Sequence, residues 1–137
     1  MILMDTGPFV ALFDRKDSQH ERCKAILKKI REPLSTTVPV LTEAFHMLDP
    51  GSQGSANLRE LIMRGGISLW FMDHSAIVRS FELMERYADH PMDLADASLI
   101  TAAESLQTRR IFTIDRDDFS TYRIRHGHHQ VAVEIVG

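Results

Sequence analysis

The chain of 137 residues carries a formal net charge of -3 at pH 7, and 44% of its residues are hydrophobic. This length and composition suit one domain with a full core and leave no room for a second, so we expect residues 1–137 to form a single domain. The negative charge argues against broad, non-specific nucleic-acid binding, because phosphate affinity rests mostly on clustered Lys and Arg.

The cysteine content and the N-terminus indicate the compartment. The single cysteine, Cys23, excludes an internal disulfide and lacks the paired spacing of a zinc site, which favours a reducing compartment and an ordinary helical role for this residue. The apolar run at residues 1–4 is too short for a signal sequence. No stretch approaches the roughly 20 apolar residues of a membrane span. We therefore expect a soluble, cytoplasmic protein without a membrane association.

The first half of the chain alternates strand and helix patterns. The expected elements are a buried strand over residues 1–4, a helix opened by Pro8, an amphipathic helix over 20–30, a strand over 34–37, a helix opened by Pro39, a turn over 49–55 and a helix over 57–63. Proline at the first helical position is typical of a helix start. In residues 20–30 the apolar side chains recur at three and four residues, which leaves a basic outer side.

The second half continues the alternation. The expected elements are a strand over residues 67–72, a helix from Ser75 to about Asp89, a helix over 93–106, a strand over 110–114 and a final strand over 131–136. This order predicts a mostly parallel sheet covered by helices on both faces. In such sheets ligands bind beyond the carboxyl ends of the strands, near a topological switch point.

Four acidic residues share one sequence context. Each lies at a strand end or in the first turns of a helix, with small or apolar neighbours: Asp5, Glu43, Asp96 and Asp115. Such neighbours predict that Asp96 and Asp115 are only partly exposed. Taken singly, such an acid is equally well explained as a helix cap or turn residue, as for Asp5 before Pro8, or for Asp93 at the start of its helix.

Several carboxylates in one partly buried cleft repel each other, so without a counterion some must take up protons. A hard divalent cation removes this conflict, and ligation by oxygen alone suits Mg²⁺ or Mn²⁺. Such an ion supports an in-line displacement at a phosphate. The acidic residues therefore predict a hard-metal centre if the fold brings them together.

The sequence resembles the PIN-domain nucleases, especially the VapC-like toxins of bacterial and archaeal toxin–antitoxin pairs. The matching fragments are MILMDTGPFVALFD with Asp5, TEAF with Glu43, MDLADASLITAAE with Asp96, and IFTIDRDDF with Asp115. Their order and spacing cover nearly the whole chain. The resemblance implies a three-layer α/β/α sandwich with a mostly parallel central sheet, a Mg²⁺ or Mn²⁺ site, and endonucleolytic hydrolysis of RNA by the toxin of such a pair.

The resemblance also assigns roles to individual residues. Asp5, Asp96 and Asp115 are expected to hold the metal. Glu43 is expected to position a second ion or the attacking water, and Thr113 supports Asp115. Asp93 faces the same cleft or caps its helix, and Asp117 and Asp118 are expected in a solvated loop.

Substrate binding requires local basic groups, because the chain as a whole is acidic. The candidates are Arg116, Arg123, Arg125, His126, His128 and His129, with a second patch at Lys24, Lys28 and Lys29.

The expected partners are an RNA substrate, a cognate antitoxin and a second copy of the chain in a homodimer. Exposed apolar residues at Leu12, Phe13, Met47 and Leu48 are candidates for antitoxin contact.

The alternative functions are a PIN-domain nuclease that is not a toxin and a non-catalytic PIN module that binds RNA or protein. A phosphatase of the haloacid-dehalogenase type is disfavoured because Gly7 stands where its second Asp belongs. A response-regulator receiver is disfavoured because its final Lys is replaced by an acid.

Overall fold

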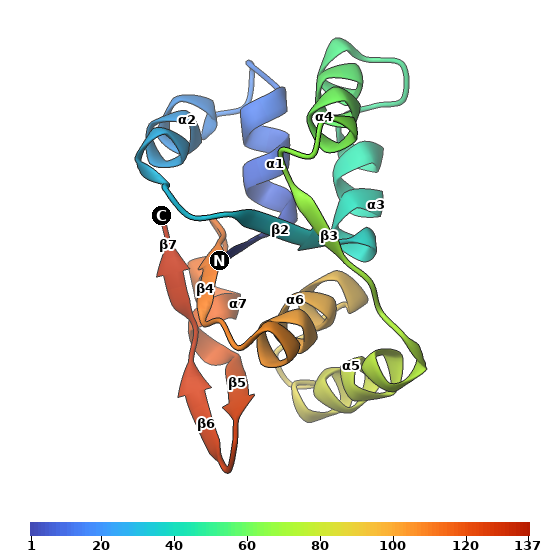
Figure 1. The fold of residues 1–137 in the computed structure, drawn as a ribbon, viewed down its shortest axis with the longest axis vertical. Helices are drawn as coiled ribbons and strands as arrows, with labels where there is room; N and C mark the ends of the chain where they lie inside the picture. Colours follow the sequence, from blue (N-terminus) through green and yellow to red (C-terminus); the bar gives the residue numbers. More distant parts are fainter.

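Five parallel strands form the central sheet of the computed structural model, which describes residues 1–137 (Figure 1). Their spatial order is β3 (Ser68–Trp70), β2 (Leu34–Thr37), β1 (Ile2–Met4), β4 (Arg110–Phe112) and β7 (Glu134–Val136). Every neighbouring pair is parallel. The central strand, β1, is buried along its whole length, as its purely apolar sequence predicts for a strand covered on both faces.

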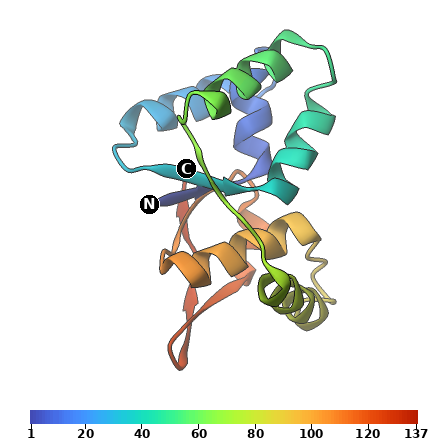
Figure 2. The same ribbon diagram turned by 45° about the vertical axis from the view of Figure 1, so that its right-hand side comes forward.

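Helices cover both faces of this sheet (Figure 2). One face carries α1 (Thr6–Phe13), α2 (His20–Lys29), α3 (Val38–Met47) and α4 (Gln53–Met63), and the other carries α5 (His74–Arg86) and α6 (Leu94–Leu106). The predicted mostly parallel α/β/α sandwich is confirmed. None of the helices combines the length and the apolar character needed to cross a membrane.

The segment between β4 and β7 differs most from the prediction. It forms a short helix, α7 (Arg116–Thr121), and an antiparallel hairpin of β5 (Arg123–His126) and β6 (His129–Ala132). Asp117 and Asp118 therefore lie in the first turn of α7 rather than in a loop. The single final strand predicted for residues 131–136 is wrong, because β6 pairs with β5 in a separate sheet and only β7 joins the central one.

Smaller differences concern the region around α3 and α4. Helix α4 begins at Gln53, within the predicted turn, because the Ser52 side chain accepts a hydrogen bond from the Ser55 amide and caps it. Leu48, expected at the surface, is buried in the core, whereas Met47 beside it is 56% exposed. Cys23 is a buried residue of α2, as expected.

Helix α6 is the most deeply buried helix, and residues 97–103 have no exposed side chain. It packs between the sheet and α5, and it also contacts α3 and strand β5. Three alanines and two hydroxyl residues in this stretch keep the helix narrow enough for neighbours on several sides. One of the hydroxyls, Thr101, makes a 2.9 Å hydrogen bond with Ser80 of α5, which satisfies both buried groups.

The strand order places a topological switch point between β1 and β4. From β1 the chain proceeds to β2 and β3 on one side and later returns to β4 on the other. In sheets of this kind, such a switch point is where ligands bind, beyond the carboxyl ends of the strands. Asp5 follows β1 there, and its amide donates a 3.0 Å hydrogen bond to the carbonyl of Phe112, the last residue of β4.

Gly54 marks the closest approach of α4 to α1. A Cβ atom at this position would lie 2.3 Å from the Phe13 carbonyl oxygen. We predict that Gly54→Ala lowers the free energy of unfolding by about 1–3 kcal/mol, because backbone must move to relieve the overlap. Urea denaturation measures the change. Ala56→Ser, at an exposed position of the same helix, is the control and should stay within about 0.5 kcal/mol of the parent. Equal stability of both variants would contradict this prediction.

Candidate metal centre

Asp5 is the buried anchor of the acidic site. The residue is only 7% exposed. One carboxylate oxygen, Oδ1, accepts a 2.8 Å hydrogen bond from the Thr6 amide, and the other, Oδ2, accepts one of 2.8 Å from the Thr113 hydroxyl. Asp5 is also the N-cap of α1. Capping and membership of the acidic site are therefore compatible, because each carboxylate oxygen has a second lone pair to offer.

The hydroxyl of Thr6 connects Asp5 to Glu43. It donates a 2.9 Å hydrogen bond to Oε1 of the Glu43 side chain, across 37 residues of sequence. Glu43 is half-buried on α3, and α3 packs against α1. Two adjacent residues at the start of α1 thus contact two of the other site residues, Thr113 and Glu43.

Asp96 reaches the site from the other face of the sheet. It lies in the first turn of α6 and is half-buried, as predicted. Its Oδ2 accepts a 3.3 Å hydrogen bond from the hydroxyl of the fully buried Tyr122. Asp93 is exposed and caps α6 by accepting a 2.8 Å hydrogen bond from the Asp96 amide, so its expected capping role is confirmed. Sequence alone offers no signal for Tyr122, which lies 26 residues from Asp96.

Asp115 lies at the outer rim of the site. Its amide donates a 3.0 Å hydrogen bond to the Thr113 hydroxyl, and this same hydroxyl donates to Asp5. Asp115 caps α7 through the Asp118 amide, at 3.1 Å. The side chain is more exposed than expected, because it begins a surface helix rather than ending a buried strand. Thr113 is buried and sets the spacing between Asp5 and Asp115.

Electrostatic strain marks these carboxylates as one group. Burial is the main cause that raises the pKa of Asp5 to about 6. The charges of Glu43 and Asp115 add to the rise, whereas the hydrogen bonds from the two threonines oppose it. Burial, followed by the charges of Asp93 and Asp5, raises the pKa of Asp96 to about 8. These contributions mean that Asp5 lies within electrostatic reach of Glu43, Asp115 and Asp96.

The remaining two acids are shifted in the same direction. Burial and the neighbouring Asp93 carboxylate raise the pKa of Glu43. Burial and Asp118 raise the pKa of Asp115, against a smaller lowering by the charge of His90. Like charges held close together without full solvation shift pKa values upward in this way. Four carboxylates from four different segments therefore contribute to one field of negative charge.

The donor set suits a hard divalent cation, because it consists entirely of carboxylate oxygens. In the side-chain positions of the structure, no three acidic or imidazole groups converge closely enough to bind one ion directly between them. Mg²⁺ keeps several of its waters in protein sites and uses only one or two carboxylates directly. The donor set is therefore compatible with an ion held partly through water, and Asp5, Asp96 and Asp115 stay the predicted ligands.

A second contact joins the helices that carry Glu43 and Asp96. The Thr37 hydroxyl, which caps α3, lies 2.6 Å from the Ser98 hydroxyl of α6. Ser98 in turn donates a 2.7 Å hydrogen bond to the Ala95 carbonyl in the first turn of α6. All of these polar groups are buried, so the contact fixes the two helix starts relative to each other.

Comparison with known proteins supports the assignment of the fold. No family model matches the chain. The chain is 24% identical to the ribonuclease VapC26 of Mycobacterium tuberculosis over 124 residues, which cover 89% of this chain and 92% of that protein. The crystal structure of the sarcin–ricin loop cleaving toxin VapC20 of the same species matches with a TM-score of 0.79 at 16% identity, covering 86% of this chain and 92% of the toxin.

A toxin–antitoxin complex from Klebsiella pneumoniae also matches, with a TM-score of 0.68 at 17% identity and coverage of 88% of this chain and 92% of that one. At these identities the solved structures establish the fold and not the chemistry. Together, the sequence relative and the structural neighbours confirm the resemblance to VapC-like PIN-domain proteins that the acidic motifs indicate.

The raised pKa values predict how stability depends on pH. The folded-state pKa of Asp5 is about 6 and that of Asp96 about 8, against the ordinary value of 3.8 for an aspartate side chain. Because both folded values lie above the unfolded one, the contribution of these groups is most favourable below about pH 4. It is lost as the pH rises through the folded values. In the metal-free protein we therefore expect the stability contributed by this site to fall between pH 4 and pH 8.5.

Asp96→Asn tests this dependence, because the amide stays neutral at every pH. We predict that the variant is more stable than the parent at pH 8.5 by roughly 1–2 kcal/mol, after allowance for partial exposure of the side chain. Near pH 4 the difference should vanish. Urea denaturation in the presence of a chelator measures both values. Asp89→Asn, at an exposed position, is the matched control and should track the parent at both pH values. Lower stability of Asp96→Asn at pH 8.5 would refute the prediction.

Proposed function

We propose that this chain is a metal-dependent endoribonuclease that hydrolyses RNA phosphodiester bonds, and that it acts as the toxin of a toxin–antitoxin pair. One observation carries the proposal: Asp5, at the switch point of the sheet, lies within electrostatic reach of Glu43, Asp96 and Asp115, and all four carboxyl groups have raised pKa values. Sites with several perturbed carboxylates in a crevice are typical of catalytic centres.

The proposed roles follow from position. Asp5, Asp96 and Asp115 hold Mg²⁺ or Mn²⁺, which supplies stabilisation of the negative charge that develops on the phosphate. Glu43 lines a hollow together with Asp93, and the Thr6 hydroxyl fixes one of the Glu43 oxygens. Its raised pKa suits a group that accepts a proton from an attacking water. Thr113 holds the spacing of Asp5 and Asp115, and Tyr122 holds Asp96.

RNA as the substrate is supported by relatives rather than by the carboxylates. The sequence relative is a ribonuclease, and one structural neighbour is a toxin that cleaves the sarcin–ricin loop. The carboxylates alone support a hard-metal centre for phosphate chemistry. A non-catalytic PIN module is less well supported, because such a module has no need of four mutually repelling acids, which reduce the stability of the fold.

Cleavage of defined RNA tests the proposal. Purified protein is incubated with tRNA and ribosomal RNA fragments, with and without Mg²⁺ or Mn²⁺, and the products are separated by electrophoresis. We predict endonucleolytic products only with metal. Asp96→Asn and Asp5→Asn should lower the rate by at least about 100-fold, the order expected for the loss of one electrostatic catalytic group. Asp89→Asn, outside the site, should cleave at the parent rate.

Three outcomes of this assay would contradict the proposal. Full activity of a folded Asp96→Asn protein would remove that residue from the centre. Metal-independent cleavage shared by the parent and Asp96→Asn would indicate a contaminating nuclease, and no cleavage of any RNA by the folded, metal-loaded parent would favour the non-catalytic alternative.

An antitoxin contact is proposed at the hollow between the end of α1 and the α3–α4 connection. Its volume is about 650 Å³, and Phe13, Met47 and Leu48 contribute its apolar lining. An exposed apolar residue beside a hollow is the feature that an amphipathic helix of a partner requires. The partner protein itself and the homodimer stay predictions, and the toxin–antitoxin complex among the structural neighbours supports the former.

Substitution of Met47 tests this contact. Met47 is 56% exposed at the hollow, and Met63 is 78% exposed at the end of α4, outside it. We predict that Met47→Glu abolishes co-purification with the product of a neighbouring small reading frame, because a charge would have to be buried without a partner. Met63→Glu, the matched control, should retain the complex. Retention by Met47→Glu or loss in both variants would place the antitoxin elsewhere.

A further inference from the structure

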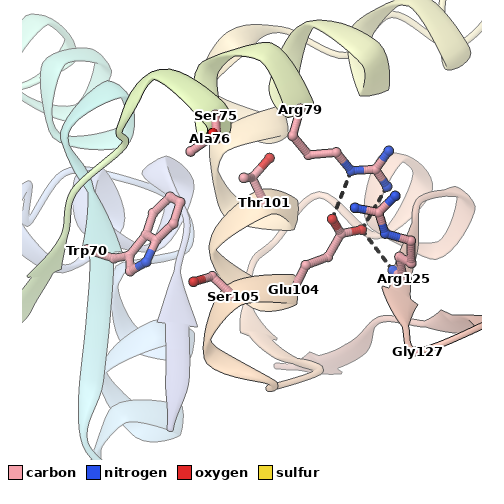
Figure 3. A pocket seen from close by; sticks show the side chains of 9 residues that line it. All are labelled: Trp70, Ser75, Ala76, Arg79, Thr101, Glu104, Ser105, Arg125 and Gly127. Carbon is pink, nitrogen blue, oxygen red and sulfur yellow. Dashed lines mark hydrogen bonds and ion pairs between the residues drawn. The ribbon is translucent and has the colours of Figure 1, made fainter.

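A second hollow lies on the α5–α6 face of the molecule, outside the acidic site (Figure 3). It has a volume of about 450 Å³ and lies between the end of β3, the start of α5, the end of α6 and the β5–β6 hairpin. Trp70 forms one wall and Arg125 stands on the opposite side, with Ser75 and Ser105 between them. A volume of a few hundred cubic ångströms suits a ligand about the size of one nucleotide.

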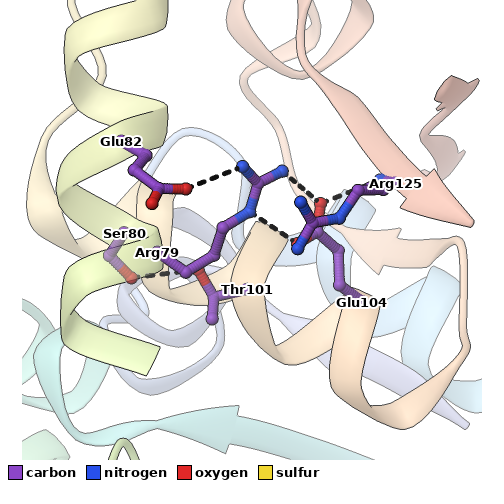
Figure 4. A network of polar contacts seen from close by, with 6 residues as sticks. All are labelled: Arg79, Ser80, Glu82, Thr101, Glu104 and Arg125. Carbon is purple, nitrogen blue, oxygen red and sulfur yellow. Dashed lines mark hydrogen bonds and ion pairs between the residues drawn. The ribbon is translucent and has the colours of Figure 1, made fainter. Parts of the chain in front are cut away.

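An ion-pair network forms the floor beside Arg125 (Figure 4). Arg79 of α5 binds both carboxylate oxygens of Glu104 of α6, through Nε and Nη2 at 2.9 Å each. Glu104 also accepts a 2.8 Å hydrogen bond from the Arg125 backbone amide. The Arg79 and Glu104 side chains are only 16% and 10% exposed. These contacts fix the hairpin to α5 and α6 and occupy Glu104 fully.

The groups that remain free are an aromatic ring and a cation. The Arg125 side chain makes no hydrogen bond or ion pair within the chain, and neither does the indole N–H of Trp70. The Arg125 guanidinium lies beside that of Arg79 (Figure 4), but Arg79 is paired with both Glu104 and Glu82. The exposed Arg125 side chain is therefore the cation of this group that has no carboxylate of its own, and phosphate geometry suits a guanidinium group.

The hairpin adds to this positive character. No acidic residue occurs between positions 123 and 132, although the whole chain has a net charge of -3. Arg123 at its base is engaged with backbone carbonyls of residues 120–122, whereas Arg125 is exposed. The three histidines of the hairpin are also exposed. The hairpin therefore offers a local cationic surface on an otherwise acidic protein.

Helix α6 connects this hollow to the acidic site. Asp96 lies in its first turn and Glu104 in its last, a separation of about 12 Å at 1.5 Å per residue. A single strand with the stacked rise of about 3.4 Å per nucleotide covers this distance in about four nucleotides or fewer. A strand that crosses the acidic site can therefore reach the hollow.

We propose that this hollow binds one nucleotide of the RNA strand, within about four nucleotides of the cleaved bond, with its base stacked on Trp70 and its phosphate at Arg125. The proposal rests on the proposed function, because it takes RNA as the ligand. An aromatic face with a nearby cation is the combination by which proteins bind unpaired nucleotides without strict sequence preference. The basic patch of Lys24, Lys28 and Lys29 on α2 has no exposed aromatic side chain within the same helix, so it lacks the stacking element.

The single tryptophan allows a direct test. A single-stranded RNA of eight adenosines is titrated into the Asp96→Asn protein without added metal, so that binding is measured without cleavage. Binding is followed by fluorescence anisotropy of the labelled RNA and by the intrinsic fluorescence of Trp70. We expect the RNA to quench Trp70, because a base stacks on the ring.

Two substitutions measure the contributions of the Arg125 cation and the Trp70 ring to RNA affinity separately. On the Asp96→Asn background, Arg125→Ala should weaken binding about tenfold and lower the slope of log K against log salt by about 1. Trp70→Leu, which keeps an apolar side chain, should weaken binding by about fivefold or more. Arg59→Ala, at an exposed position on α4 without a recorded partner, is the matched control and should change affinity less than twofold. Circular dichroism verifies that each variant is folded.

The result that overturns the proposal is RNA binding with unchanged Trp70 fluorescence and equal affinity in folded Arg125→Ala and Arg59→Ala proteins. RNA binding that is lost to the same degree in both variants would also overturn it, since it would reflect overall charge. These readouts need no cleavage. The nucleotide site and the nuclease function can also fail separately. If RNA quenches Trp70 and Arg125→Ala binds RNA more weakly, but the metal-loaded parent cleaves no RNA, the nucleotide site is supported and the nuclease function is refuted.

Discussion

The parallel pairing of β1 with β4 is the contact on which the acidic site depends. It pairs the first strand of the chain, residues 2–4, with a strand from its last third, residues 110–112, and it creates the switch point of the sheet. The pairing extends one residue further through the hydrogen bond from the Asp5 amide to the Phe112 carbonyl. Asp5 and Thr113 consequently leave the sheet side by side. A shift of one residue in this register would turn Asp5 away from Thr113 and break their hydrogen bond.

Threonine hydroxyls then convert this pairing into a defined arrangement of carboxylates. Thr113 donates to Asp5 and accepts from the Asp115 amide, and Thr6 donates to Glu43. A hydroxyl suits this task because it is donor and acceptor at once, and it adds no charge to a site that already has an excess. The hydrogen bonds offset only part of the rise in the pKa of Asp5, so the folded protein retains repulsion that a bound cation would relieve.

The sequence predicted most of the central sheet well because strand and helix ends depend on local patterns. An apolar run followed by an acid at Asp5 defines a strand end, and Asp93 before the Ala- and Leu-rich run that ends at Leu106 defines a helix start. The segment of residues 116–132 was harder to predict. Helix α7 has only six residues, too few for a periodic pattern to emerge. The hairpin strands have alternating but mostly exposed side chains, which resemble a loop in composition.

Contacts between distant segments were not predictable from the sequence. Tyr122 reaches Asp96 only because α7 directs the chain back towards the start of α6, and Thr37 meets Ser98 only because α3 and α6 cross at the sheet edge. In both cases a hydroxyl lies deep in the core, where an unpaired polar group would be costly. The position of Asp115 was predicted, whereas its exposure depended on the unpredicted helix α7.

An acidic site that acts on a polyanion has to solve an electrostatic problem. The carboxylates that attract a divalent cation repel the phosphates of the strand that must reach it, and the chain as a whole is negative. Attraction for the substrate therefore has to be local and displaced from the carboxylates. Helix α6 provides that displacement, because it is buried along its middle and carries Asp96 at one end and Glu104, which positions the Arg125 backbone, at the other. In the proposed function, a rigid, buried helix would keep the two charges at a constant separation, so that an RNA strand held at the cationic end would arrive at the acidic end in a limited set of positions.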